Sequence, residues 1–154
     1  MATTVTSATL TVTLKEAITL NGTAYTQTVT QSVTGINNVS KKLVSCPASN
    51  TTTIATFSSN VYDSAGALDL EDTKYIRITN LDDTNELELA IVGAATLYQV
   101  ALRAGESHIL GTPDNLMLAE ADTSPSFGTM ADVNSIQANP GANAIDVEIF
   151  VASA

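Results

Sequence analysis

Four acidic residues crowd one short stretch of the sequence and are its first candidates for chemistry. The stretch RITNLDDTNELEL, residues 77–89, contains Asp82, Asp83, Glu86 and Glu88. Clustered carboxylates can bind a metal ion or take part in catalysis. The alternative is that these acids form the solvated rim of a hairpin in a structural protein.

The spacing of the acids favours the hairpin rim. Linear calcium loops place acids at alternate positions, with a glycine at the bend and a terminal glutamate, and DDTNE lacks both the glycine and the spacing. Adjacent aspartates are common at hairpin tips because aspartate accepts turn conformations and hydrogen-bonds its own backbone. Glu86 and Glu88 lie two residues apart, on the strand face opposite Leu87 and Leu89. We therefore predict a solvated hairpin rim and no metal site.

The remaining reactive residues predict no catalytic site. Cys46, the single cysteine, lies in KKLVSCPAS and is expected to be a small buried residue at a strand end. It cannot form an intrachain disulfide, which is consistent with a reducing compartment. His108, the single histidine, is expected at a solvated strand end, and its neighbour Ser107 points to the other face, so the two do not form a nucleophile and its base.

Two further patterns also argue against an enzyme. The acidic DLED at residues 69–72 is expected in a solvated loop. No glycine-rich phosphate loop follows a strand and opens a helix, so the motif for nucleotide binding is missing. We predict no catalytic residue, no cofactor site and no metal site.

Charge and hydropathy limit the partners. Six basic residues stand against sixteen acids, which gives a net charge of −10. The basic residues are scattered along the chain, at Lys15, Lys41, Lys42, Lys74, Arg77 and Arg103. Because nucleic-acid affinity depends on neutralising phosphates, we expect no direct nucleic-acid binding. The amino terminus lacks the features of a signal peptide and no apolar run reaches the roughly 18 residues of a membrane helix, so we expect no membrane partner.

The elements that must position these residues are strands. In SATLTVTL apolar residues alternate with threonine, the period of two of a strand with one buried face. Asn21-Gly22 is the favoured pair for a two-residue type I′ turn and predicts a hairpin over the first 30 residues. The pairs across it would be Leu20 with Thr23, Ile18 with Tyr25, Glu16 with Gln27, and Leu14 with Val29. Most of these pairs match an apolar residue with an apolar one or a polar residue with a polar one, which supports this register.

Further strand candidates follow at hairpin spacing. They are KKLVSC (41–46), TTIATF (52–57), KYIRIT (74–79), ELELAIV (86–92), TLYQVALR (96–103), ESHIL (106–110), NLMLAEA (115–121), NSIQA (134–138) and IDVEIFV (145–151). The stretches at 58–73 and 122–134 are rich in loop-forming residues. About ten short strands with little or no helix predict an all-β antiparallel sandwich or jelly roll. We expect one sandwich domain over residues 8–154, preceded by a flexible arm at 1–7 that either pairs with a neighbouring subunit or is a frayed terminus.

Five stretches together carry a family resemblance. They are ITLNG, GINNVSKKLVSCP, KYIRITNLDDTNELEL, VALRAGESHILG and AIDVEIFVA. In this combination the chain resembles small structural proteins of tailed bacteriophages, particularly those of aquatic bacteria. The resemblance covers essentially the whole chain, but its motifs are turns and strands, and they assign no functional residue.

The resemblance implies a non-enzymatic virion protein. It implies an all-β module that is made in the host bacterial cytoplasm and added in many copies as a decoration or cement protein on the outer capsid surface. The expected partners are the major capsid protein and the chain itself, and symmetric lattices favour a homotrimer. The alternative is a tail or fibre component or an adhesion module. Glycan recognition is disfavoured because the chain has no tryptophan, four tyrosines and three phenylalanines.

Overall fold

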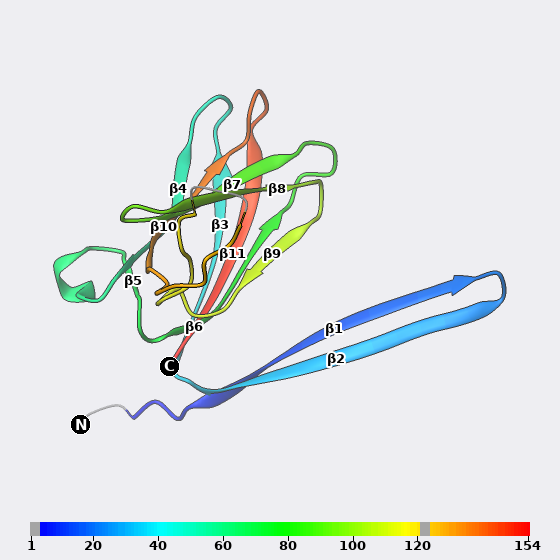
Figure 1. The fold of residues 1–154 in the computed structure, drawn as a ribbon, viewed down its shortest axis with the longest axis horizontal. Coiled ribbons are helices and arrows are strands. Elements are labelled where there is room, and N and C mark those ends of the chain that lie inside the picture. The colour runs from blue at the N-terminus through cyan, green and yellow to red at the C-terminus, as the bar shows by residue number, and fades with distance from the viewer. Residues whose placement is uncertain (1–3, 121–123) are drawn as a thin grey trace.

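The computed structural model describes residues 4–120 and 124–154, and their regular structure is almost entirely strand. Within these residues there are eleven strands and one short 3-10 turn, η1 (Val61–Asp63). Two sheets stack face to face, and a long separate hairpin extends away from them (Figure 1). The predicted all-β, antiparallel, sandwich-like fold is confirmed. No helix in the described part of the chain is long and apolar enough to cross a membrane.

The sandwich consists of a four-stranded and a five-stranded sheet. The four-stranded sheet has the order β3 (Asn38–Cys46), β11 (Ile145–Ser153), β6 (Thr73–Asn80) and β9 (Ser107–Leu110). The five-stranded sheet has the order β5 (Leu68–Asp69), β4 (Thr52–Ser58), β10 (Val133–Asn139), β7 (Leu87–Gly93) and β8 (Leu97–Leu102). Strand pairs are antiparallel except for the two-residue pairing of β4 with β5.

The core lies between the two sheets. In the four-stranded sheet, alternation turns Ile76 and Ile78 of β6 inward. In the five-stranded sheet, it turns Leu89 and Ile91 of β7 and Ile136 of β10 inward. All five side chains have no exposed surface. Burying an aliphatic side chain of this size contributes roughly 1.5–3 kcal/mol relative to leaving it exposed, so this layer holds the sheets together.

The hairpin of β1 (Ala8–Leu20) and β2 (Thr23–Ile36), here called the arm, stands apart from both sheets (Figure 1). Its turn has positive φ at Asn21 (51°) and Gly22 (80°), as a type I′ turn requires. All four predicted cross-strand pairs are observed. Residues 8–36 are expected to belong to the sandwich domain, but the arm is a separate two-stranded sheet that pairs with neither sheet of the sandwich.

The flexible N-terminal segment expected at residues 1–7, which precedes the hairpin, falls partly outside the described residues. Residues 1–3 are not described, and residues 4–7 are exposed and precede the first strand. The long projecting element of this chain is therefore the β1–β2 hairpin that follows them.

The prediction that the four acids lie on a hairpin is wrong, because the strands on either side of them belong to different sheets. β6 belongs to the four-stranded sheet and β7 to the five-stranded sheet, so residues 81–86 cross from one sheet to the other. The physical reason is burial, because the isoleucines of β6 and the leucines of β7 pack against each other across the core instead of lying side by side. β3 and β4 are likewise in different sheets.

The predicted strand at 115–121 is absent from its described part, residues 115–120, apart from one isolated bridge between Met117 and Ala131. Both edges of β10 are already paired, with β4 and with β7, so no edge is free there for a further strand. Met117 is nevertheless buried and packs on the core as part of a loop.

Candidate functional site

Asp82 builds the turn that carries the sheet-to-sheet crossing. Its Oδ1 accepts hydrogen bonds from the backbone N–H groups of Thr84 (2.8 Å) and Asn85 (2.6 Å) and from the Asn85 side chain (3.1 Å). The backbone donors at Asn85 and Thr84 lower the pKa of the Asp82 carboxyl. Asp83 accepts a hydrogen bond from the Thr84 hydroxyl (2.9 Å). Asp82 therefore stabilises the turn, as its residue type predicted, whereas Asp83 accepts no backbone donor of the described turn.

Asn80, which the sequence analysis did not single out, anchors the same loop from inside. It has no exposed surface, and its Nδ2 lies within hydrogen-bonding distance of the carbonyl oxygens of Asn85 (2.9 Å), Leu102 (3.0 Å) and Arg103 (3.2 Å). Its Oδ1 accepts the Asp82 N–H (3.0 Å). One side chain thus ties the crossing loop to the end of β8. An asparagine directly after a period-two strand was the only signal in the sequence.

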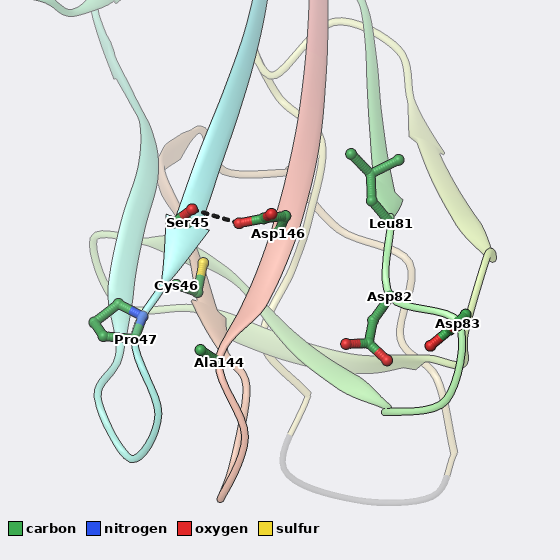
Figure 2. Close-up of a pocket in the computed structure, with 8 residues that line it drawn as sticks. All are labelled: Ser45, Cys46, Pro47, Leu81, Asp82, Asp83, Ala144 and Asp146. Carbon is green, nitrogen blue, oxygen red and sulfur yellow. Dashed lines mark hydrogen bonds between the residues drawn. The ribbon is translucent and has the colours of Figure 1, made fainter.

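A pocket of about 690 Å³ opens beside this loop, between it and the adjoining ends of β3 and β11 (Figure 2). Asp82 and Asp83 line one side, and Ser45 and Asp146 line the other, where the Ser45 hydroxyl donates to the Asp146 carboxylate. Cys46 lies at the base of this side and is buried. Burial raises the pKa of its thiol, and the nearby Asp146 charge adds to the rise, which disfavours the reactive thiolate.

The pocket does not assemble a reactive group. Asp82 uses its carboxylate on the backbone of its own turn, and Asp146 accepts from Ser45. Among the described residues, histidine, cysteine, aspartate and glutamate side chains form no group of three or more placed to hold a metal ion. Glu86 and Glu88 are exposed beside the buried Leu87 and Leu89, as predicted from their spacing.

His108 lies inside the edge of the sandwich, and its expected position at a solvated strand end is wrong. The ring is half-buried, and its Nε2 lies 3.3 Å from the Tyr98 hydroxyl of the opposite sheet. Burial lowers the pKa of His108 and raises that of Tyr98. Ser107 points to the other face, where its hydroxyl lies 2.8 Å from that of Thr79, so the two neighbours are separated as predicted. The histidine and tyrosine join the two sheets.

The DLED stretch also contains a turn former. Asp69 accepts the backbone N–H groups of Glu71 and Asp72, each at 3.0 Å. The acids of this patch are largely solvent-facing, and the Lys74 ammonium donates to the Glu71 carbonyl oxygen at 2.6 Å. This arrangement shapes the entry into β6.

The arm offers a different kind of site, an apolar binding face. Alternation gathers the large apolar side chains of both strands on one face, interrupted by the pair Glu16 and Gln27, and places most threonines on the other. Five large side chains of its outer half have more than half of their surface exposed: Leu14, Ile18, Leu20, Tyr25 and Val29. In the sequence, this alternation predicts a buried face. The pattern gives the face, but only the tertiary arrangement shows that no described residue of the sandwich covers its outer half.

Comparison with known proteins identifies no family for this fold and site. No family model matches the chain, and no curated protein matches it. One solved structure is similar over 75% of this chain and 87% of its own, with 10% identity and a TM-score of 0.41. It comes from a study of Bacillus endospore appendages described as a novel family of disulfide-linked pili. A TM-score of this size supports no inference about function or assembly.

Proposed function

We propose that the chain is a non-enzymatic structural subunit of a virion, a decoration or cement protein on the outer surface of a tailed-phage capsid. The observation that carries this proposal is the arm, whose exposed apolar face suits contact with another subunit of a repeating assembly. Contiguous exposed apolar surface of this kind marks interaction sites in soluble proteins. The resemblance of the fold-bearing stretches to phage structural proteins supports the virion as the setting.

The charge distribution supports the outside of the shell. Residues 37–154, which form the sandwich, contain five basic and fifteen acidic residues, a net charge of −10. Such a surface repels packaged DNA, and the sandwich therefore fits better on the outer face than lining the genome. The proposed partners are the major capsid protein and further copies of the chain, with a homotrimer as the expected oligomer.

The contact with the shell is expected to be mainly apolar. Only six basic residues are available for ion pairs, and exposed pairs contribute little each. Binding should therefore persist when salt is raised. By binding the assembled state selectively, the protein should raise the melting temperature of the shell.

The test is to mix the purified protein with undecorated capsids of the phage that encodes it, at 50 mM and at 500 mM salt. Occupancy is scored by electron microscopy and shell melting by calorimetry. Occupied outer sites and a higher shell melting temperature at both salt concentrations are the expected result. Binding that disappears at moderate salt contradicts the apolar contact.

The same microscopy distinguishes the second candidate, a tail or fibre component. A long arm that links one subunit to the next would also suit a fibre, which gives this candidate its structural support. Absence from the capsid together with density on the tail would replace the decoration proposal with this one.

A further inference from the structure

The base of the arm already shows what its apolar face binds. Leu10, Val12 and Val33, at the end nearest the sandwich, pack against Tyr75 and Ala152 on the outer face of the four-stranded sheet. The cross-strand pairs Leu10 with Val33 and Leu14 with Val29 place the exposed outer half of the arm on the same face as this covered base. The arm face is therefore continuous, covered at its base and uncovered beyond it.

The outer face of the four-stranded sheet has apolar groups that the chain's own arm does not reach. Val39 and Leu43 of β3 and Ile109 of β9 are 54%, 69% and 51% exposed. The register places all three on the face of Phe150, because their partners Ala152, Glu148 and Arg77 all lie on it. Each copy of the chain thus presents two uncovered apolar surfaces, the outer half of its arm and this sheet face.

Charge favours contact between these two surfaces in a protein that otherwise repels its own copies. Lys15 and Glu16 point to opposite faces of the arm, so only Glu16, which pairs with Gln27, lies on the apolar face. On the sheet face, Glu148 accepts from Arg77 (2.6 Å) and pairs with Lys41 (2.9 Å). The two bonds lower the pKa of Glu148, led by the one from Lys41, so this pairing is retained at neutral pH. Next to Phe150 the sheet face therefore has two basic residues, Lys41 and Arg77, against Glu148, which suits the single acid of the arm face.

We propose that the outer half of the arm of one copy docks on the outer face of the four-stranded sheet of a second copy. The contact would extend between molecules the arm-to-sheet packing that the base makes within one molecule. It also explains how a two-stranded hairpin persists so far from its own core, because such hairpins are marginal in water without a packed face. The contact is heterologous, so it closes into a ring or continues as a chain of subunits. It does not depend on the capsid location.

Paired variants test this inference directly. In the arm variant, Leu14→Thr, Ile18→Thr and Val29→Thr remove the apolar face while keeping strand-forming residues. In the sheet variant, Val39→Thr, Leu43→Thr and Ile109→Thr do the same on the other surface. Self-association of each, measured by analytical ultracentrifugation, should be at least tenfold weaker than that of the unchanged protein. An equimolar mixture should form one-to-one complexes, because each variant retains the surface that the other lacks.

Two controls keep a negative result interpretable. Thr13→Ser, Thr28→Ser and Thr30→Ser alter the opposite face of the arm and should leave association unchanged. p-Benzoylphenylalanine in place of Tyr25, mixed with ¹⁵N-labelled unchanged protein and irradiated, should crosslink to the labelled copy near Val39, Leu43 or Ile109.

Three outcomes overturn the inference. The first is a monomer at every concentration of the unchanged protein. The second is a sheet variant that self-associates as well as the unchanged protein. The third is crosslinking to the labelled arm, which indicates arm-to-arm pairing. These measurements use no capsid, so their failure is separate from failure of the proposed function.

Discussion

The buried side-chain amide of Asn80 holds the crossing loop to the end of β8. Asn80→Ala removes the donor that reaches three backbone carbonyl oxygens and the acceptor for the Asp82 N–H. Buried polar groups left unpaired cost about 1–3 kcal/mol each, so we expect a loss of about 3 kcal/mol in the free energy of unfolding, measured in urea. Asn143→Ala is the matched control, because Asn143 is exposed and its side chain donates to the Asn85 side chain at the surface of the same loop. A loss no larger than that of the control would contradict the anchoring role.

The depressed pKa of Asp82 predicts a pH-dependent contribution to stability. A carboxyl whose folded pKa lies below its ordinary value of about 3.9 stabilises the fold above that pH, and the stabilisation is lost as pH falls through the folded pKa. Asp82→Asn should therefore be less stable than the unchanged protein at pH 7, and the gap should shrink as the pH is lowered towards 2.

Urea midpoints at pH 7, 4 and 2 measure that gap. Asp83→Asn makes the same change of charge without the two backbone donors, so its gap should be smaller at pH 7. A gap for Asp82→Asn that stays constant across the range would show that the charge of this carboxylate does not matter to the turn.

At the scale of elements, the arm should unfold separately from the sandwich. Gly22→Val places a β-branched residue at a φ of 80°, where nothing crowds the new Cβ but the backbone conformation is strongly disfavoured. We expect faster amide hydrogen exchange along β1 and β2, with the melting temperature of the sandwich nearly unchanged, because the turn is remote from the core.

Thr26→Val is the control for this experiment, since it adds the same side chain in the middle of an extended strand. Its arm amides should exchange at the original rate. A large fall in sandwich melting with Gly22→Val would mean that the arm and the sandwich fold as one cooperative unit.

At the scale of the whole molecule, charge is divided unevenly along the chain. Residues 1–62 have three basic residues and one acid, a net charge of +2, against −12 for residues 63–154. Repulsion among the fifteen acids should destabilise the sandwich at low ionic strength. Raising salt from 50 to 500 mM shortens the screening length from about 14 Å to about 4 Å and should raise the melting temperature.

Dilute samples keep self-association out of this measurement. Glu71→Gln combined with Asp72→Asn removes two negative charges and should melt at a higher temperature in low salt, with a smaller response to added salt. A melting temperature that falls with salt would show that favourable ion pairs, such as that of Lys41 with Glu148, outweigh the repulsion.

The sequence determined what depends on neighbours along the chain. Alternation gave the strands and the side each residue faces, and Asn21-Gly22 gave the turn and the register of the arm, because turn conformation and strand period are local properties. The spacing of Glu86 and Glu88 likewise gave their exposure. The turn-forming role of Asp82 followed from residue type alone.

The tertiary structure decided which face meets which partner. A period of two separates the faces of a strand, but it does not say whether the apolar face lies on a core, as in β7, or is left uncovered, as in the outer arm. The period of two also does not determine whether two consecutive strands pair within one sheet or face each other across the core. The sequence therefore predicted a hairpin of β6 and β7, whereas the two strands belong to opposite sheets. Asn80 owes its role to carbonyl groups more than twenty residues away, which only folding brings within reach.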